Sequence, residues 1–505
     1  MDQDRQWRGV PYPQHAAARG GRAAHRRRPA HAALGRDHAR ARGRDLSRGC
    51  TTALLALGAA LALASSLPAC KKAPRKVAPD AAALTPWSDA WLTDQGQRFI
   101  EDTAWRRQAL LDSLTNHKNS YSRQRLGSYA LGDRGWDSLP VWNPRSRALD
   151  AALASSVTAT LAAGDGLAMP PGTPPLWDGQ RPTNQAEWIE LGRRVFFAFP
   201  LRAEVFMEFA LPRPELQAAV GVEHTPAGDF PGLVLFDDVD GRTRVGITCA
   251  VCHTTVEDGR LIIGAARRKF DYGKLRIAYH NETHEPVEAE LMRRMATWGP
   301  GRADVTEDLD EDPVAIPDLW GLRDQSVLTQ AGTIRHIGPA ALAIRQETQL
   351  LHANHQRIRP PRELAWALAM YLYSLAPPPR ESPVTPEVTR GRALFDDTCR
   401  KCHDNAAYGG EPVPAARVGT DRALADGGAR GTGTYRPAPL LRIFAAGPYF
   451  HHGAVPTLED VLSPERLQPG YTRSPLRPGP VPGHEYGTDL SADDRAALVA
   501  FLKTL

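Results

Sequence analysis

The chain has 505 residues, of which 42% are hydrophobic and 24% charged, so it is long enough to bury more than one core. Its formal net charge of +5 comes from the first 48 residues, which hold twelve arginines and four aspartates, whereas residues 71–505 carry −3. No basic stripe interleaved with aromatic residues remains in that part, which argues against a nucleic-acid partner.

Residues 1–70 have the layout of a leader and signal peptide. An arginine-rich segment precedes an uncharged apolar stretch of 18 residues at 51–68, which is short for a retained membrane helix, the alternative. Leu-Pro-Ala-Cys at 67–70 resembles a bacterial lipobox, and Ala-Leu-Ala at 62–64 offers a competing cleavage site. We therefore expect an exported protein on the periplasmic or outer-surface side, with Cys70 as the candidate site of a lipoprotein's membrane-anchoring lipid.

Residues 71–176 are predicted to form a tether followed by a small helical region. The segment from residue 71 to about 84 is rich in Lys, Ala and Pro, which is typical of a linker. Apolar residues then recur at helical spacing over 87–114 and over 150–163. Two Pro-Pro pairs, at 170–171 and 174–175, mark a boundary before the next region.

Two copies of Cys-X-X-Cys-His dominate the rest of the chain, Cys-Ala-Val-Cys-His at 249–253 and Cys-Arg-Lys-Cys-His at 399–403. Two thiols at this spacing add across the two vinyl groups of one haem, and the adjacent histidine binds the iron. The motifs therefore predict two covalently bound haem c groups. The attachment and iron-ligand residues are Cys249, Cys252, His253, Cys399, Cys402 and His403.

Zinc binding or dithiol redox chemistry is the alternative for these cysteines. The two pairs are 150 residues apart, whereas zinc ribbons usually separate their pairs by about 15 to 20 residues. Neither alternative explains a histidine after both pairs.

An internal repeat supports two units of the same kind. Leu-Gly-Arg-Arg-Val-Phe-Phe at 191–197 precedes the first motif as Arg-Gly-Arg-Ala-Leu-Phe-Asp at 390–396 precedes the second, and helical patterns close the units at 364–375 and 496–505. Five prolines at 376–386 form a stiff linker, and 198–248 is an insertion in the first copy. We expect a mainly α fold in which long loops and a few short strands, one at 244–249, complete two cytochrome c-like haem domains, 177–376 and 384–505.

Several of these segments resemble bacterial di-haem cytochrome c peroxidases and their relatives, including the di-haem rubber oxygenases. The resemblance covers about residues 177–505 and rests on 191–197, both haem motifs, Gly-Arg-Ala-Asp at 301–304, Ile-Pro-Asp-Leu-Trp at 316–320 and 447–461. It implies two cytochrome c-like domains, one haem passing electrons and the other, in active members, meeting peroxide or oxygen.

The second haem departs from the peroxidase pattern. The family usually supplies a methionine as second iron ligand in the C-terminal domain, but the last methionine here is Met370. His484 resembles the position used by the oxygenase-like branch and is the predicted ligand, with His451 and His452 as competitors. A histidine on a solvated loop is the alternative for His484.

The first haem lacks the acidic pair that the resemblance implies, since the corresponding segment reads Arg-His-Ile-Gly-Pro-Ala-Ala-Leu-Ala-Ile at 335–344. His336, Gln346 or Glu347 are candidates to replace that acid, and His336 is equally a candidate iron ligand or a packed loop residue. Trp320 is a candidate electron route between the haems, with a packed core indole as the competing interpretation. The open candidates for a second ligand of the first haem are Met292, Met295, His280 and His284.

The sequence therefore predicts an exported di-haem c-type cytochrome that transfers electrons to or from a redox partner protein that its residues do not identify. The alternative is a di-haem peroxidase or oxygenase whose first haem is open to substrate. A structural or zinc-binding lipoprotein is the third class, and it predicts no covalent haem.

Overall fold

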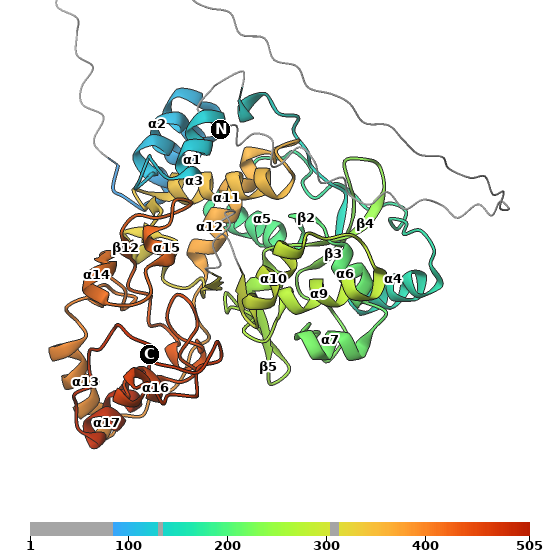
Figure 1. The fold of residues 1–505 in the computed structure, drawn as a ribbon. Helices are drawn as coiled ribbons and strands as arrows, with labels where there is room; N and C mark the ends of the chain where they lie inside the picture. The colour runs from blue at the N-terminus through green and yellow to red at the C-terminus, as the bar shows by residue number, and fades with distance from the viewer. Residues whose placement is uncertain (1–83, 130–134, 304–312) are drawn as a thin grey trace, which may run out of the picture. The chain divides into compact units, whose positions relative to one another are not determined.

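The computed structural model describes residues 84–129, 135–303 and 313–505 (Figure 1). Residues 84–505 form one compact unit, rich in helix and containing small antiparallel sheets. The predicted leader, Cys70 and nearly all of the tether lie outside the described residues. In the described ranges no helix is long and apolar enough to cross a membrane.

The N-terminal region consists of helices, as predicted, but the first one is interrupted. The periodic segment 87–114 forms two helices, α1 (Asp89–Glu101) and α2 (Thr103–Ser113). Asp102 separates them because its carboxylate accepts a hydrogen bond from the Trp105 amide at 2.9 Å and caps α2. The chain continues with α3 (Ser120–Ser128) and with α4 (Ala151–Ala163), which matches the predicted helix over 150–163.

The insertion 198–248 builds most of a small antiparallel sheet. Its strands β2 (Arg202–Ala203), β3 (Leu233–Asp237) and β4 (Thr243–Ile247) join β1 (Ser146–Ala148) in the order β1-β3-β4-β2. The predicted strand over 244–249 is thus present as β4. The sheet packs with α4, α6 (Val205–Ala210) and α7 (Pro214–Val220) around one hydrophobic cluster.

The first Cys-X-X-Cys-His motif lies on a short helix that runs directly into a hairpin. Helix α8 (Ala250–His253) is followed without a break by β5 (Thr254–Glu257), which pairs with β6 (Arg260–Ile263). The remaining elements of this part are α9 (Tyr272–Thr283), α10 (Ala289–Trp298), β7 (Arg302–Ala303), β8 (Val314–Ala315), β9 (Val327–Leu328), β10 (Ile334–Arg335) and α11 (Pro339–Ala353).

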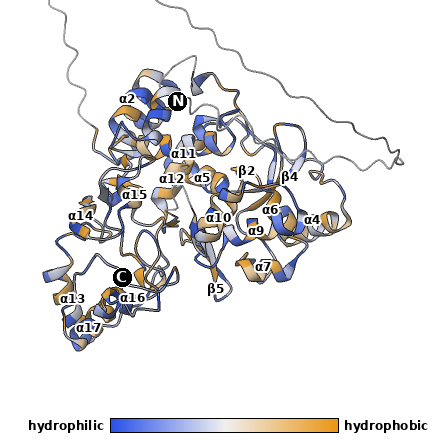
Figure 2. Cartoon of the chain, in the orientation of Figure 1, coloured by the Kyte–Doolittle hydropathy of each residue, from blue (hydrophilic) through white to orange (hydrophobic). Residues whose placement is uncertain are grey.

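Helices α5 (Gln185–Ala198) and α12 (Arg362–Ser374) cross at Gly192. A Cβ atom at Gly192 would lie 2.0 Å from the carbonyl oxygen of Ala367 and 2.6 Å from Cβ of Tyr371, so only glycine permits this approach. Residues 364–372 of α12 are apolar on every face of the helix (Figure 2). All of them are buried.

Helices α13 (Pro386–Thr398) and α17 (Ala492–Leu502) repeat this crossing around the second motif. A Cβ atom at Gly391 would lie 1.9 Å from the carbonyl oxygen of Ala497 and 2.9 Å from Cβ of Phe501. In both pairs a glycine of the opening helix meets an alanine carbonyl and the aromatic residue four positions later on the closing helix. The sequence repeat therefore corresponds to a repeated packing arrangement.

Loops and short elements fill the region between α13 and α17, in agreement with the long loops expected from the sequence. These elements are β11 (Val413–Pro414), α14 (Ala415–Val418), α15 (Ala423–Asp426), β12 (Thr434–Tyr435) and α16 (Leu458–Val461). The region also contacts the first half of the chain. The Ala315 amide donates to the His451 carbonyl at 2.7 Å, and Arg442 forms an ion pair with Glu257. The division into domains at 177–376 and 384–505 stays a prediction.

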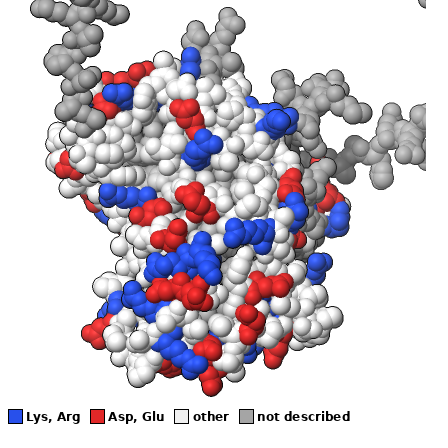
Figure 3. All heavy atoms as spheres, turned by 90° about the vertical axis from the view of Figure 1, so that its left-hand side faces the viewer, with Lys and Arg blue, Asp and Glu red and all other residues white. Residues whose placement is uncertain are grey.

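Charged side chains of both signs are mixed on the face that Figure 3 shows. Some of the ion pairs are local, such as Arg422 with Asp426 and Arg400 with Asp396, one helical turn apart. On this face, basic side chains are interspersed with acidic ones.

Candidate haem-binding site

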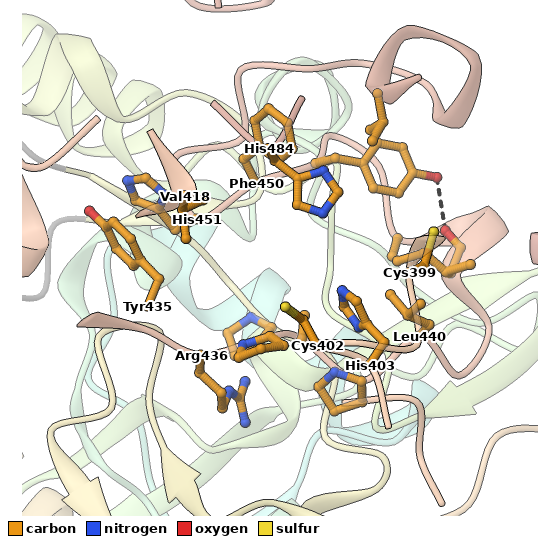
Figure 4. A pocket seen from close by; sticks show the side chains of 18 of the residues that line it. Cys399, Cys402, His403, Val418, Tyr435, Arg436, Leu440, Phe450, His451 and His484 are labelled. Atoms are coloured by element: carbon orange, nitrogen blue, oxygen red, sulfur yellow. Dashed lines mark hydrogen bonds between the residues drawn. The ribbon is translucent and has the colours of Figure 1, made fainter. Parts of the chain in front are cut away.

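A cavity of about 400 Å³ lies beside the second Cys-X-X-Cys-His motif (Figure 4). This volume is within the usual range of small-molecule sites, roughly 300–1,000 Å³. Its wall is mainly apolar and draws on both halves of the chain. The apolar lining includes Phe395, Leu440, Phe450, Leu458, Leu462 and Leu502.

Backbone turns place the two thiols and the imidazole of this motif around one space. Cys399 ends α13, and its carbonyl accepts hydrogen bonds from the amides of Cys402 and His403, both at 3.1 Å. His403 Nδ1 lies 2.6 Å from the Tyr408 carbonyl oxygen, an acceptor that fixes the proton on Nδ1 and leaves Nε2 free. Burial lowers the pKa of His403, so the imidazole is held neutral, the form that binds a metal.

His484 faces His403 across the cavity (Figure 4). Their ring centroids are 6.5 Å apart and their planes make an angle of 73°. The loop is fixed from behind, since the His484 amide donates to the Val418 carbonyl and Arg466 donates to the His484 carbonyl, both at 2.8 Å. Burial lowers the pKa of His484 to about 4, and the neighbouring His403 imidazole acts in the same direction.

This spacing fits one iron between the two rings. An imidazole nitrogen binds such a metal at about 2.0 Å, so two axial imidazoles place their ring centroids roughly 6 Å apart. His484 Nδ1 is also buried without a hydrogen-bond partner in the described chain. The cavity, the paired thiols and the opposed imidazoles are together suited to a covalently attached haem.

The competing histidines have other contacts. The ring of His451 lines the cavity but stacks on Tyr435, with centroids 4.1 Å apart. His452 Nδ1 accepts a hydrogen bond from the Ala454 amide at 3.1 Å, and the residue lies outside the cavity wall. The geometry therefore favours His484 over both as the partner of His403.

The first motif repeats the support that the second gives its histidine. His253 Nδ1 lies 3.1 Å from the Pro317 carbonyl oxygen, again leaving Nε2 free, and burial lowers the pKa of His253 to about 4. Burial, together with the neighbouring Cys252, raises the pKa of Cys249 to about 12. A thiol held in this protonated form is not poised for dithiol exchange, which needs the thiolate.

Trp320 lies between the two motifs. Its side chain is buried and lines the cavity of the second motif. Its indole nitrogen donates to the Ile263 carbonyl at 3.1 Å, and Ile263 is paired with Thr254, the residue after His253. The structure thus brings Trp320 close to both motifs, although the sequence alone could not separate this placement from a core position.

His336 has both ring nitrogens in hydrogen-bond contact. Nδ1 lies 2.7 Å from the Gln325 carbonyl oxygen and Nε2 lies 2.5 Å from the Tyr373 hydroxyl. Glu347, a second candidate acid, is fully buried and pairs with Arg362 at 3.1 Å and Tyr129 at 2.7 Å. These contacts favour structural roles for both residues.

The open candidates for a second ligand of the first haem remain spread over α9 and α10. His280 Nδ1 contacts the Glu285 carbonyl at 3.1 Å, and Met295 is buried under α9. In the described residues, no contact favours one of these candidates over the others as the second ligand. In the described ranges there is also no group of three or more His, Cys, Asp and Glu side chains suited to a metal ion, so the two cysteine pairs do not gather into one zinc site.

Three comparisons with known proteins bear on the site. Residues 433–471 match the model of the RoxA-like, cytochrome c-like family. An uncharacterized protein, y4iJ, of Sinorhizobium fredii is 29% identical over 147 residues, which cover 22% of this chain and 24% of that protein. A solved structure of a MauG-like protein associated with microbial copper homeostasis is 18% identical, with a TM-score of 0.29 over 42% of this chain and 79% of that one.

The family match lies in the wall of the second cavity, since it spans Tyr435, Phe450 and His451. This part of the chain is therefore cytochrome c-like, in agreement with the predicted haem chemistry of the Cys399–His403 motif. The aligned part of this chain corresponds to about a quarter of the curated relative's length.

Proposed function

We propose that the protein is an exported di-haem c-type cytochrome that transfers electrons. The observation that carries this proposal is the opposition of His403 and His484, with ring centroids 6.5 Å apart, over the thiols of Cys399 and Cys402. A haem held there supplies one-electron exchange at its iron.

The chain's residues set the character of that haem. The neutral imidazoles of His403 and His484 would both hold the iron of a bound haem, and they would leave no site there for a small ligand. They also give a lower reduction potential than a His/Met pair, because thioether ligation raises it. The Tyr408 carbonyl orients His403 and makes it a stronger donor. Such a site suits electron transfer better than activation of a bound substrate.

The first motif is proposed to hold the other haem c group of the molecule, the first haem, through Cys249, Cys252 and His253. The matching crossings at Gly192 and Gly391 support two units of one design. Trp320, which contacts the β6 strand of one motif and the cavity of the other, is the proposed electron route between them.

A catalytic first haem, in a di-haem peroxidase or oxygenase, is the alternative function. Heterolysis of a bound peroxide needs an acid–base group, worth roughly 10²- to 10⁴-fold in rate. His336 and Glu347 both have other partners, which argues against this role. Addition of peroxide to the purified protein separates the two functions, because electron transfer alone predicts no peroxide turnover and the alternative predicts a rapid one.

Export is proposed because residues 1–70 have a signal-peptide layout, with a lipid on Cys70 as the membrane anchor. The functional partner is then a redox protein in the same compartment. We propose no nucleic-acid partner, because residues 71–505 carry a formal charge of −3.

Replacement of His484 tests the electron-transfer site. The oxidised wild-type protein should show a low-spin, six-coordinate second haem in absorption and magnetic spectra. His484→Ala removes one ligand and should convert that haem to a high-spin form. His452→Ala, a change at a nearby half-buried histidine outside the cavity wall, should leave the spectrum unchanged. A low-spin second haem in His484→Ala would show that another residue binds the iron.

A further inference from the structure

Arg436 is a buried arginine in the wall of the second cavity (Figure 4). It follows β12 and its exposed fraction is only 8%. Its backbone amide donates to the Gln330 carbonyl at 3.0 Å, but its side chain forms no hydrogen bond or ion pair with any residue that the structure describes. The guanidinium Nε is buried with no partner.

The other cations of the cavity wall are accounted for. Arg268 donates to the Ile316 carbonyl at 2.6 Å and to the Asp318 carboxylate at 3.0 Å. Lys401 and Arg417 are exposed, so water solvates their charges. Among the described cations of this wall, Arg436 therefore lacks both a protein partner and free access to solvent.

An unpaired buried charge is costly, because burial removes the guanidinium from water without a compensating anion. Burial lowers the pKa of Arg436 to about 10, which still leaves the group charged at neutral pH. An arginine in this position calls for an anion that the polypeptide does not supply, and the cavity is the space where that anion fits.

We propose that Arg436 binds a propionate carboxylate of the haem attached at Cys399 and Cys402. This inference rests on the proposed function. Thioether bonds use the vinyl groups of a haem c, and its two propionates remain as anions. A planar guanidinium binds a carboxylate through two parallel hydrogen bonds. The segment is correctly placed, because the backbone of Ala438, two residues further on, contacts His403 on the same wall.

The pairing predicts an effect on the reduction potential that a packing role would not produce. In the wild type the guanidinium cancels the propionate charge and keeps that carboxyl ionised, so the potential of the second haem should be independent of pH near neutrality. In Arg436→Gln the unpaired carboxylate stabilises the ferric iron, and the potential should fall. The carboxyl should then titrate near neutral pH, and the potential should rise as the pH is lowered.

Spectroelectrochemical titration of the full-length holoprotein between pH 5 and 8 tests this, following the second haem by its low-spin signature. Arg436→Lys should retain most of the wild-type potential, and Arg422→Gln, at an exposed cation outside the cavity wall, should match the wild type. If Arg436→Gln carries both haems and its potential is unchanged and independent of pH, Arg436 does not bind the propionate. That result would leave the proposed function standing. Absence of covalent haem from the wild type would instead overturn the proposed function.

Discussion

At the scale of single residues, the site depends on backbone carbonyls that orient the histidines. His253 and His403 contact the carbonyls of Pro317 and Tyr408 through Nδ1, and each keeps Nε2 for a metal. The sequence predicted both histidines, because the motif itself specifies them. It could not identify Pro317, Tyr408 or Arg436, since a carbonyl acceptor or an unpaired guanidinium leaves no pattern in the order of residues.

Trp320 is expected to speed electron exchange between the haems. The indole of Trp320 donates to the Ile263 carbonyl and lines the cavity of the second motif. Trp320→Leu removes this indole, so electron transfer between the haems should slow several-fold. Flash photolysis or stopped-flow reduction of the purified protein measures the rate. Trp366→Leu is the control, because Trp366 is equally buried but packs within the α12 core. Equal transfer rates in the wild type and Trp320→Leu would show that Trp320 has only a packing role in the core.

His352 should make folding stability depend on pH. Burial, followed by the charge of Arg125, lowers its pKa to about 3 from an ordinary value near 6.5. Between these values the unfolded chain binds the extra proton, so the free energy of unfolding should fall as the pH falls from 6.5 towards 3, with a slope of up to about 1.4 kcal/mol per pH unit.

Urea unfolding of wild type and variants at several pH values checks this slope. His352→Gln should lower the slope by up to about 1.4 kcal/mol per pH unit, the contribution of one proton, whereas His117→Gln, at an exposed histidine, should preserve it. A slope that His352→Gln leaves intact would show that other groups carry the pH dependence.

At the scale of elements, the repeated helix pairs were the most predictable part of the fold. The glycines at 192 and 391 and the apolar closing patterns indicated the same helix used twice, and α5/α12 and α13/α17 do cross in the same way. Asp102 was the exception, since its capping hydrogen bond splits a segment with continuous helical periodicity. The sheet of the insertion was also mostly missed, because strands as short as β2 carry no periodic signal.

The crossings should tolerate no side chain at the glycines. Gly391→Ala would bring Cβ within 1.9 Å of the Ala497 carbonyl, so α13 and α17 must separate, at a cost of roughly 1–3 kcal/mol or more in the free energy of unfolding. Gly127→Ala in α3 is the matched control. Its Cβ would meet no atom within 4 Å, and alanine should stabilise that helix by about 0.5–1 kcal/mol. Thermal and urea unfolding measure the free energy of unfolding of both variants. An equal change in the two variants would show that α13 and α17 are not closely packed at Gly391.

At the scale of the whole molecule, the two motif regions are connected through the segment that precedes and includes Trp320. Pro317 contacts His253 and lines the cavity of the second motif, and Arg442 of the second region pairs with Glu257 beside the first motif. Contacts of this kind join residues far apart in sequence, so the sequence could predict two units but not their connection. If both proposed haems are bound, we expect these contacts to give a short path for electrons between them.

The proposed function requires that haem is covalently bound at both Cys-X-X-Cys-His motifs. The most direct test is the mass of the intact, denatured protein produced in a host with cytochrome c maturation machinery. We expect a mass that exceeds that of the processed polypeptide, with any lipid, by two haem groups, and a haem stain that survives denaturation. A colourless protein with the mass of its polypeptide alone would contradict it.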